Sequence, residues 1–324
     1  MIILLGITLG LFCNDESKAF EILETKLHDK GPYQIELLSG GLSESKIYKV
    51  SSPLKTYAFR FWNKQWIDFY PQDLAGQLIG SEAGYGPKIY YSDEKDCITV
   101  MDYCPHSRPS DDVRLNELGN LLKKIHNGPE LPKGIDKAKD FEDSIDELSK
   151  LNLPYIDFSL IKKVKDAIYR HREMPFVPCH RDLHPGNISY AKDKFWAFDY
   201  TWCGMDDPYF DIATIALFNC VDEKKNRELL TVYLGREPTK RELAKLSLFK
   251  QASKMFYGLE FLRLYPSKPS TLPPHPLTNR YLTFGLAGSQ FTPDDYTEFA
   301  VSFLNEIIEY DNGGELEKNL IELQ

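Results

Sequence analysis

The chain has few cysteines, and their spacing excludes the structures that cysteine patterns usually indicate. Its 324 residues contain six cysteines and no Cys-x-x-Cys pair. They are Cys13, Cys97, Cys104, Cys179, Cys203 and Cys220. A zinc site built on cysteine needs closely spaced pairs, and a disulfide-stabilised secreted domain needs a denser set. The pattern therefore favours a protein of the reducing cytoplasm.

The chain also lacks a long hydrophobic run. Its most apolar stretch, "MIILLGITLGLFC" at residues 1–13, is shorter than the roughly 20 residues that a membrane-spanning helix needs. No positive charge precedes this stretch, and Phe12 ahead of Cys13 makes a poor signal-peptidase site. We therefore expect no stable membrane span, and a buried or frayed segment ahead of a helix at residues 17–29. A membrane-tethered protein is the alternative.

Basic charge is scarce as well. Lys and Arg number 39 against 48 Asp and Glu, a net charge of −9, and no basic cluster rises above this background. A nucleic-acid partner is therefore not expected. Hydrophobic residues at 42% and charged residues at 27% are typical of a globular protein. An acidic chain suits a small cationic substrate.

The hydrophobic pattern changes character once along the chain. Residues 33–102 contain five strand-like segments around one helix at residues 71–83, and residues 103–107 lead to a region of helical period. We therefore predict an α+β fold in which a small antiparallel-sheet lobe (33–104), preceded by the segment 1–32, joins a large, mainly helical lobe (105–324). The stretch 294–310 is predicted to form the last helix.

One short motif carries chemistry. "CHRDLHPGN" at residues 179–187 has the pattern His-Arg-Asp-x-x-x-x-Asn, and a strand–turn–strand segment then leads to Asp199. Phosphoryl transfer needs a carboxylate to hold the attacking hydroxyl and oxygen ligands for magnesium. Asp182 is the candidate catalytic base, and Asn187 and Asp199 are the candidate magnesium ligands. A lone Asp would usually be a turn or capping residue, but the ordered set favours catalysis.

The same letters allow a metal-hydrolase interpretation. His180, Asp182 and His184 alternate as His-x-Asp-x-His, and two imidazoles with a carboxylate can bind zinc. That interpretation leaves Asn187 and Asp199 without a role. We keep it as an alternative.

The motif and the following "AFDYTWCGMDDPYFDIA" resemble the aminoglycoside phosphotransferase/choline kinase superfamily. The resemblance implies a bilobal protein kinase-like fold, ATP and Mg2+ as cofactors, and the roles given above for Asp182, Asn187 and Asp199. It also implies that His180 and Asp211 support the catalytic loop. Asp211 follows Asp199 by only 12 positions, which leaves no room for the activation loop of a protein kinase.

The resemblance extends over residues 35–265 and implies an ATP site in the small lobe. The residues implied are Gly41 and Ser43 in a Gly-rich loop, Arg60 on the third strand, Asp73 as its partner, and the backbone at Asp102, Tyr103 and Cys104 for adenine. Arg60 replaces the lysine of protein kinases, and a guanidinium can also bind phosphate oxygens. Glu82 is a second candidate partner.

The segment "GMDDP" resembles choline kinase-like and thiamine kinase-like proteins, which implies a small alcohol such as choline or ethanolamine as acceptor. Thiamine, an aminoglycoside, and a catalytically silent nucleotide-binding module are the alternatives. Thr201 stands where choline kinases usually have Glu. The candidate substrate residues are His184, Asp207, Phe256 and Tyr257, with Phe261 and Tyr265 on the same helix. Aromatic residues at helical spacing more often belong to the core.

Overall fold

The small lobe is built on a five-stranded antiparallel sheet, as predicted. Its strands are β1 (Gln34–Leu38), β2 (Lys46–Ser51), β3 (Thr56–Phe61), β4 (Ile89–Asp93) and β5 (Ile98–Asp102), in the order β1-β2-β3-β5-β4. The computed structural model describes residues 14–38, 45–105, 107, 109–151, 153, 156–220, 222–265 and 291–324. The apolar segment 1–13 lies outside these residues.

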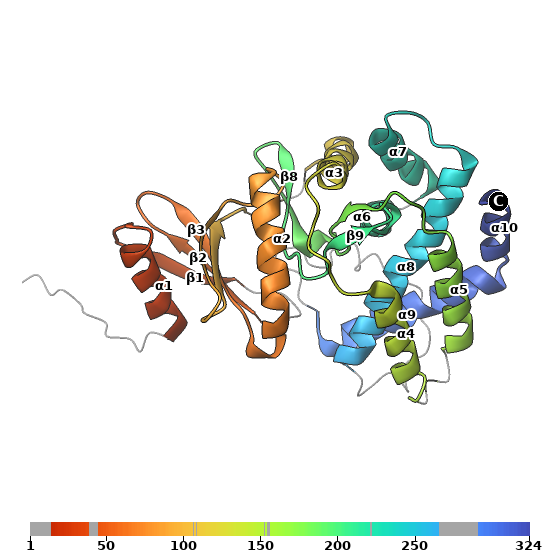
Figure 1. Ribbon diagram of the computed structural model, residues 1–324, viewed down its shortest axis with the longest axis horizontal. Coiled ribbons are helices and arrows are strands. Elements are labelled where there is room, and N and C mark those ends of the chain that lie inside the picture. Colours follow the sequence, from red (N-terminus) through yellow and green to blue (C-terminus); the bar gives the residue numbers. More distant parts are fainter. Residues whose placement is uncertain are drawn as a thin grey trace, which may run out of the picture.

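Two helices lie on opposite sides of this sheet (Figure 1). Side chains of α1 (Asn14–Thr25) pack into one core cluster with Val50, Phe59 and Val100 of the sheet. On the other side lie the 3-10 turn η1 (Lys64–Phe69) and α2 (Tyr70–Glu82). Because successive strand residues point to opposite faces, Phe59 faces α1 while Arg60 faces α2. This alternation sends Arg60 toward the large lobe.

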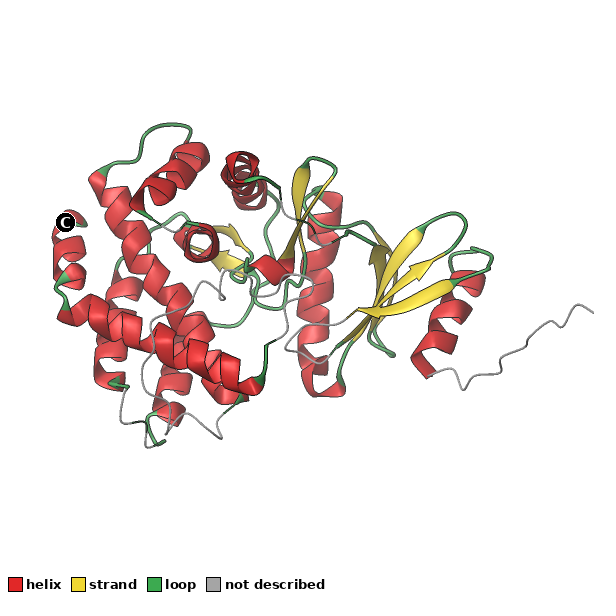
Figure 2. Ribbon diagram, turned by 180° about the vertical axis from the view of Figure 1, so that it is seen from behind, coloured by secondary structure: helices red, strands yellow, loops and turns green. Residues whose placement is uncertain are grey.

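The large lobe is mainly helical (Figure 2). Its helices are α3 (Asp111–His126), α4 (Lys137–Leu148), α5 (Phe158–Arg170), α6 (Tyr209–Asn219), α7 (Glu223–Leu234), α8 (Lys240–Leu264), α9 (Pro293–Asn312) and α10 (Glu315–Glu322). Every residue of α6 is buried, so this helix forms the centre of the lobe. Two short antiparallel pairs complete it: β6 (Val177–Cys179) with β9 (Gly204–Asp206), and β7 (Ile188–Ala191) with β8 (Lys194–Ala197). The predicted bilobal α+β fold is confirmed.

The prediction of a last helix at residues 294–310 was wrong in one respect. The predicted stretch lies within α9, but the chain continues into α10. The break between the two helices falls at Gly313 and Gly314, and Gly314 has φ of +78°, a left-handed conformation that favours glycine. Glycine thus ends α9 without ending the helical region.

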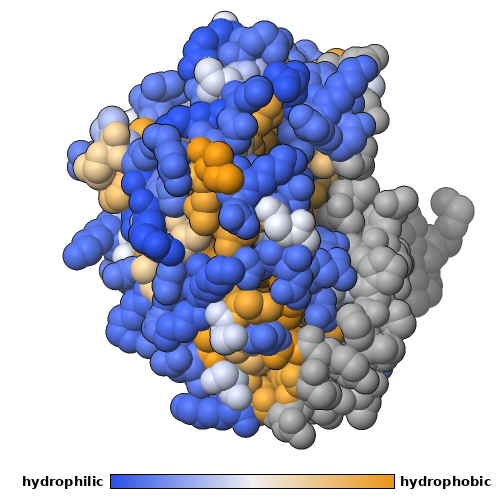
Figure 3. All heavy atoms as spheres, turned by 90° about the vertical axis from the view of Figure 1, so that its right-hand side faces the viewer, coloured by the Kyte–Doolittle hydropathy of each residue, from blue (hydrophilic) through white to orange (hydrophobic). Residues whose placement is uncertain are grey.

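The end of the large lobe that lies farthest from the sheet carries mostly hydrophilic side chains, with smaller hydrophobic areas between them (Figure 3). Across the described ranges, no helix combines the length and apolar character needed to cross a membrane.

Candidate active site

The predicted catalytic loop lies between the two short strand pairs of the large lobe. It follows β6, passes through the 3-10 turn η2 (Pro185–Asn187) and enters β7. The β7–β8 hairpin then turns the chain back, and the Phe198 amide donates a hydrogen bond of 2.8 Å to the Asn187 carbonyl. The hairpin therefore places Asp199 beside Asn187, although 12 positions separate them in the sequence.

Asp182 is held by hydrogen bonds to both carboxylate oxygens. The Tyr257 hydroxyl donates to Oδ1 over 2.7 Å, and the Asn187 amide donates to Oδ2 over 2.9 Å. Burial raises the pKa of Asp182 to about 8, while the Tyr257 hydrogen bond and the charge of Lys137 act in the opposite direction. The contact from α8 fixes the orientation of this carboxylate.

Asp199 lies in the left-handed region, with φ of +58°. Arg60 donates to its Oδ2 over 2.9 Å, and the Thr201 hydroxyl donates to its Oδ1 over 2.6 Å. Burial alone would raise the pKa of Asp199, but the Arg60 charge and the two hydrogen bonds outweigh burial and lower the pKa. Asp199 is therefore an ionised carboxylate, and Thr201 supports it directly.

Arg60 also reaches the predicted partner on α2. Its Nη1 lies 3.6 Å from Oδ2 of Asp73, which is fully buried. Asp73 accepts a further hydrogen bond from the Tyr200 amide over 2.6 Å and one from Gln77. The structure thus pairs Arg60 with Asp73 rather than with Glu82, and Asp73 ties α2 to the segment that carries Asp199.

Asp211 stabilises the start of the catalytic loop. Its carboxylate accepts hydrogen bonds from the amides of His180 over 2.7 Å and Arg181 over 2.6 Å, and it lies 3.2 Å from Nε2 of His126. The His180 ring in turn lies 2.8 Å from the Phe198 carbonyl oxygen. These contacts connect the loop to α6 and to the strand before Asp199.

The two imidazoles of the zinc alternative have separate partners. His180 contacts the Phe198 carbonyl through Nε2, whereas Nδ1 of His184 accepts a hydrogen bond of 3.0 Å from the Gly186 amide. A different trio, His126, Cys179 and Asp211, has potential ligand atoms within 4.8 Å of one another, but all three are buried. This geometry does not favour zinc at Asp182.

Magnesium fits the oxygens that the site presents. Asn187 uses its amide nitrogen for both bonds to Asp182, and within the described ranges its side-chain oxygen has no hydrogen-bond donor. This oxygen and the ionised Asp199 are the ligand types that Mg2+ prefers.

The structure describes only some of the residues predicted to bind ATP. Gly41 and Ser43 lie outside the described residues. Asp102 ends β5, with its side chain 2.5 Å from Lys55 Nζ, and the Tyr103 amide donates to the Thr56 carbonyl over 3.4 Å. Cys104 follows on the path to the large lobe.

The candidate substrate residues of α8 separate into two groups. Tyr257 reaches Asp182, and Phe256 packs edge-on against Trp202, with ring centroids 5.2 Å apart. Phe261 and Tyr265 instead pack against Tyr296 of α9. A further candidate, His184 of the catalytic loop, lies beside Tyr257, with ring centroids 6.0 Å apart. Trp202 was not among the predicted site residues, because nothing in its local sequence indicates that the loop folds against α8.

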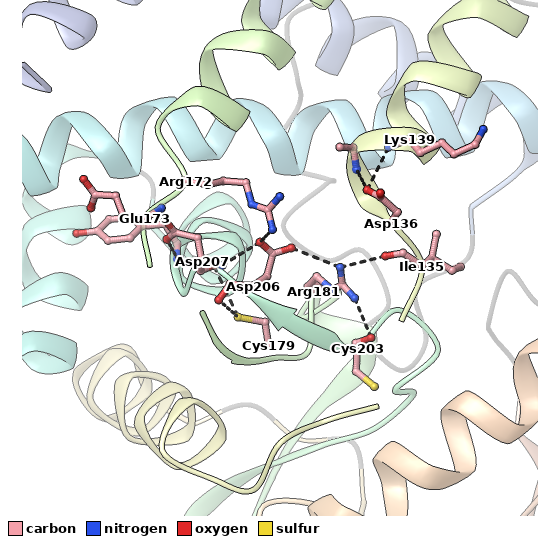
Figure 4. Close-up of polar contacts among 12 residues, drawn as sticks. Ile135, Asp136, Lys139, Arg172, Glu173, Cys179, Arg181, Cys203, Asp206 and Asp207 are labelled. Atoms are coloured by element: carbon pink, nitrogen blue, oxygen red, sulfur yellow. Dashed lines mark hydrogen bonds and ion pairs between the residues drawn. The ribbon is translucent and has the colours of Figure 1, made fainter. Parts of the chain in front are cut away.

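Asp207 has structural partners instead (Figure 4). It is fully buried, accepts a hydrogen bond of 2.8 Å from the Glu173 amide and lies 2.7 Å from Lys245 Nζ. Its neighbour Asp206 is paired with Arg172 at 2.7 Å and with Arg181 at 3.4 Å. We therefore assign no substrate contact to Asp207.

Comparisons with known proteins agree with this geometry. The chain is 26% identical over 144 residues to the protein LicA of Haemophilus influenzae. The alignment covers 41% of this chain and 54% of that protein, so the chain spans about half the length of this curated relative.

Two crystal structures have a similar fold. A choline/ethanolamine kinase family protein from Mesorhizobium loti has a TM-score of 0.72 and 17% identity, with 95% of this chain and 98% of that chain covered. Choline kinase LicA from Streptococcus pneumoniae has a TM-score of 0.62 and 16% identity, with 90% and 99% covered. At these identities the likeness shows the fold.

The family itself is shown by the sequence. The model of the phosphotransferase enzyme family (APH) matches residues 34–246, well over half of the chain and the whole span from β1 to the catalytic loop and α6. The chain belongs to the phosphotransferase enzyme family.

Proposed function

We propose that the protein is an ATP- and Mg2+-dependent kinase that transfers the γ-phosphate to the hydroxyl group of a small alcohol. The observation that carries this proposal is the arrangement around Asp182. Its carboxylate is oriented by Tyr257 and Asn187, and the ionised Asp199 is held by Arg60 and Thr201. This is the charge arrangement that phosphoryl transfer needs.

Each residue has a distinct task in this proposal. Asn187 and Asp199 would hold magnesium, which neutralises the phosphate charge when bound. Asp182 orients the acceptor hydroxyl and takes its proton. Arg60, already beside Asp199, steadies the phosphates through its guanidinium. The backbone at Asp102–Cys104 would meet adenine, and Gly41 and Ser43 would contact the phosphates.

We propose an amino alcohol such as choline or ethanolamine as the acceptor. The choline kinase among the fold neighbours and the LicA relative support it, and so does the ring pair formed by Trp202 and Phe256. Thiamine and aminoglycosides remain the alternative acceptors. A nucleotide-binding module without activity is the rival from another class.

The compartment is also a proposal. The described cysteines, Cys97, Cys104, Cys179, Cys203 and Cys220, are all free thiols. Free thiols support a reducing environment, and we propose the cytoplasm.

Coupled ADP release with ATP and Mg2+ tests the function. The acceptors are choline, ethanolamine, thiamine and kanamycin, with a reaction without acceptor as the control. We expect release that depends on one acceptor and that disappears in Asp182→Asn while nucleotide binding stays close to that of the unmodified chain. Unchanged turnover in Asp182→Asn would reject Asp182 as the base. If no acceptor stimulates ADP release although ATP binds, the nucleotide-binding module without activity would be favoured.

A further inference from the structure

A lysine of the chain occupies the ring pair of Trp202 and Phe256. Nζ of Lys137 lies 3.2 Å from the centroid of the Phe256 ring and 4.3 Å from that of Trp202. The residue is only 4% exposed, yet within the described ranges its ammonium has no hydrogen bond and no ion pair within 4 Å. Two aromatic faces therefore hold this cation in the way that proteins hold quaternary ammonium ligands.

The start of α4, which carries Lys137, is attached to the catalytic loop. Arg181 donates hydrogen bonds to the carbonyls of Ile135 over 3.2 Å and Cys203 over 2.9 Å (Figure 4). A Cβ on Gly134 would lie 2.0 Å from the Cys203 carbonyl oxygen, so only glycine allows this close approach. Asp136 then caps α4 through the Ala138 and Lys139 amides. Lys137 therefore lies at a fixed place beside the site.

The charges around Lys137 favour a cation at this place. Three carboxylates attract its ammonium, those of Asp182, Asp140 and Glu260, against one repelling cation, Arg181. Arg263 also pairs with two of them, Asp140 at 3.7 Å and Glu260 at 3.0 Å. Arg181 already has Asp206 as a partner. An anionic group in the ring pair would be repelled by these carboxylates in their ionised forms, whereas a cationic group meets the same attraction as Lys137.

We propose that the ring pair is the binding site for the cationic group of the acceptor, and that Lys137 is its internal occupant, which the acceptor displaces. This inference rests on the proposed function because it assigns the acceptor's ammonium group to the side of Asp182. Asp140, one helical turn along α4, and Glu260 on α8 receive the displaced lysine. Lys137 thereby sets the affinity and specificity for cationic acceptors.

The energetic state of Lys137 fits a replaceable occupant. Burial, followed by the charge of Arg181, lowers the pKa of Lys137 to about 7, against the attraction of Asp182, Asp140 and Glu260. Near neutral pH the side chain therefore exchanges between a charged and a neutral form. The neutral amine binds the ring faces less strongly and competes less with a permanent cation.

Calorimetric binding of tetramethylammonium to the full chain tests the proposal. This probe forms no conventional hydrogen bonds, so its affinity reports the ring faces and the surrounding charge. Lys137→Met keeps an unbranched side chain and removes the charge. We expect it to bind the probe about tenfold more tightly than the unmodified chain at pH 6, which corresponds to a cation–π contribution of ordinary size.

The matched control is Lys139→Met on the same helix, whose Lys139 side chain is 71% exposed and pairs with Asp143. It should bind the probe as the unmodified chain does. In the unmodified chain binding should tighten between pH 6 and pH 8.5, and Lys137→Met should lose that part of the pH dependence. The variant keeps Asp140, Asp182, Glu260 and Arg181, so whatever pH dependence remains belongs to them.

A second variant covers the case in which Lys137→Met repacks the site. Adding Phe256→Leu to Lys137→Met should abolish the gain in affinity, with folding checked by thermal unfolding. Equal affinity for the probe in Lys137→Met and Lys139→Met would overturn the proposal. A raised KM for every acceptor in Lys137→Met, without tighter probe binding, would do the same and make Lys137 an acceptor-binding residue. Tighter probe binding in Lys137→Met without turnover on any acceptor would support Lys137 as the occupant of the ring pair and would reject the kinase function.

Discussion

The hydroxyl of Tyr257 lies 2.7 Å from Oδ1 of Asp182, although 75 positions separate the two residues. The contact joins the long helix α8 to the catalytic loop. It orients one carboxylate oxygen, while Asn187 orients the other. In the proposed function, the acceptor side and the metal side of the site therefore meet at a single carboxylate.

Removal of the Tyr257 hydroxyl should slow catalysis. Tyr257→Phe keeps the ring, which packs against Phe218 and Phe261, but loses the hydrogen bond to Asp182. A hydrogen bond to a charged group contributes about 1.5–3 kcal/mol, so we expect kcat to fall by about 10- to 100-fold. The KM for ATP should stay unchanged. Steady-state kinetics measure both values.

The control is Tyr310→Phe, because the Tyr310 hydroxyl contacts Ser247 and Asn319 and not Asp182. It should leave kcat unchanged. An equal loss in both variants would mean that the effect is one of general destabilisation.

Loss of the Thr201 hydroxyl should raise the requirement for magnesium. Thr201→Val has a similar shape and removes the hydrogen bond of 2.6 Å to Asp199. That bond fixes the orientation of the Asp199 carboxylate, and the loss of such a supporting contact weakens metal binding. We expect the Mg2+ concentration for half-maximal activity to rise by about tenfold.

Thr231→Val is the matched control, since the Thr231 hydroxyl bonds to the Arg227 carbonyl on α7. Magnesium titrations of both variants decide the matter. The same Mg2+ requirement in Thr201→Val as in the control would remove Thr201 from the metal site.

Arg60 should contribute to stability as well as to nucleotide binding. Arg60→Met leaves the fully buried Asp73 without its cationic partner. Breaking a buried ion pair on one side costs about 3–5 kcal/mol, and we expect the free energy of unfolding in urea to fall by about this amount. Arg236→Met, which breaks an exposed pair with Glu242, should lower the free energy of unfolding far less. Similar losses in the two variants would show that Asp73 has no need of Arg60.

Low pH should reduce the stability that Glu242 contributes in the first turn of α8. Hydrogen bonds from Arg236, and then from the Thr239 cap, lower the pKa of Glu242 to about 2, below the value of about 4.3 in an unfolded chain. The stabilising contribution is therefore complete above about pH 5 and is lost as the pH falls toward 2. Because Arg236 is exposed, the effect is small. We expect the free energy of unfolding of Glu242→Gln at pH 7 to be about 1 kcal/mol below that of the unmodified chain.

Urea unfolding of the two proteins from pH 7 to pH 3 measures this difference, which should shrink across that range. A difference that stays constant with pH would assign the effect of the substitution to side-chain packing.

Local patterns in the sequence were enough to predict the sheet, the switch to helices and the order of the catalytic motif. Asp182, Asn187 and Asp199 were proposed because their spacing within one strand–loop–strand unit is itself the signal. The Arg60–Asp73 pair was proposed from the family resemblance, and the structure brings the two residues together.

Contacts between distant elements could not be predicted in the same way. Trp202 contacts α8 only because the loop after Asp199 folds against it, and Lys137 begins a helix whose placement depends on Arg181. Asp207 was a candidate substrate residue, but its partner Lys245 lies 38 positions away. No local periodicity carries such information.

The buried carboxylate of Asp73 has a consequence for how the two lobes move. It holds the Tyr200 backbone to α2, and a Cβ on Gly76 would lie only 2.5 Å from Cβ of Tyr200. α2 and the 199–201 segment would therefore move as one piece. Because the Phe198 amide also donates to the Asn187 carbonyl and the His180 ring contacts the Phe198 carbonyl oxygen, that piece stays attached to the catalytic loop, and α2 would move with the large lobe.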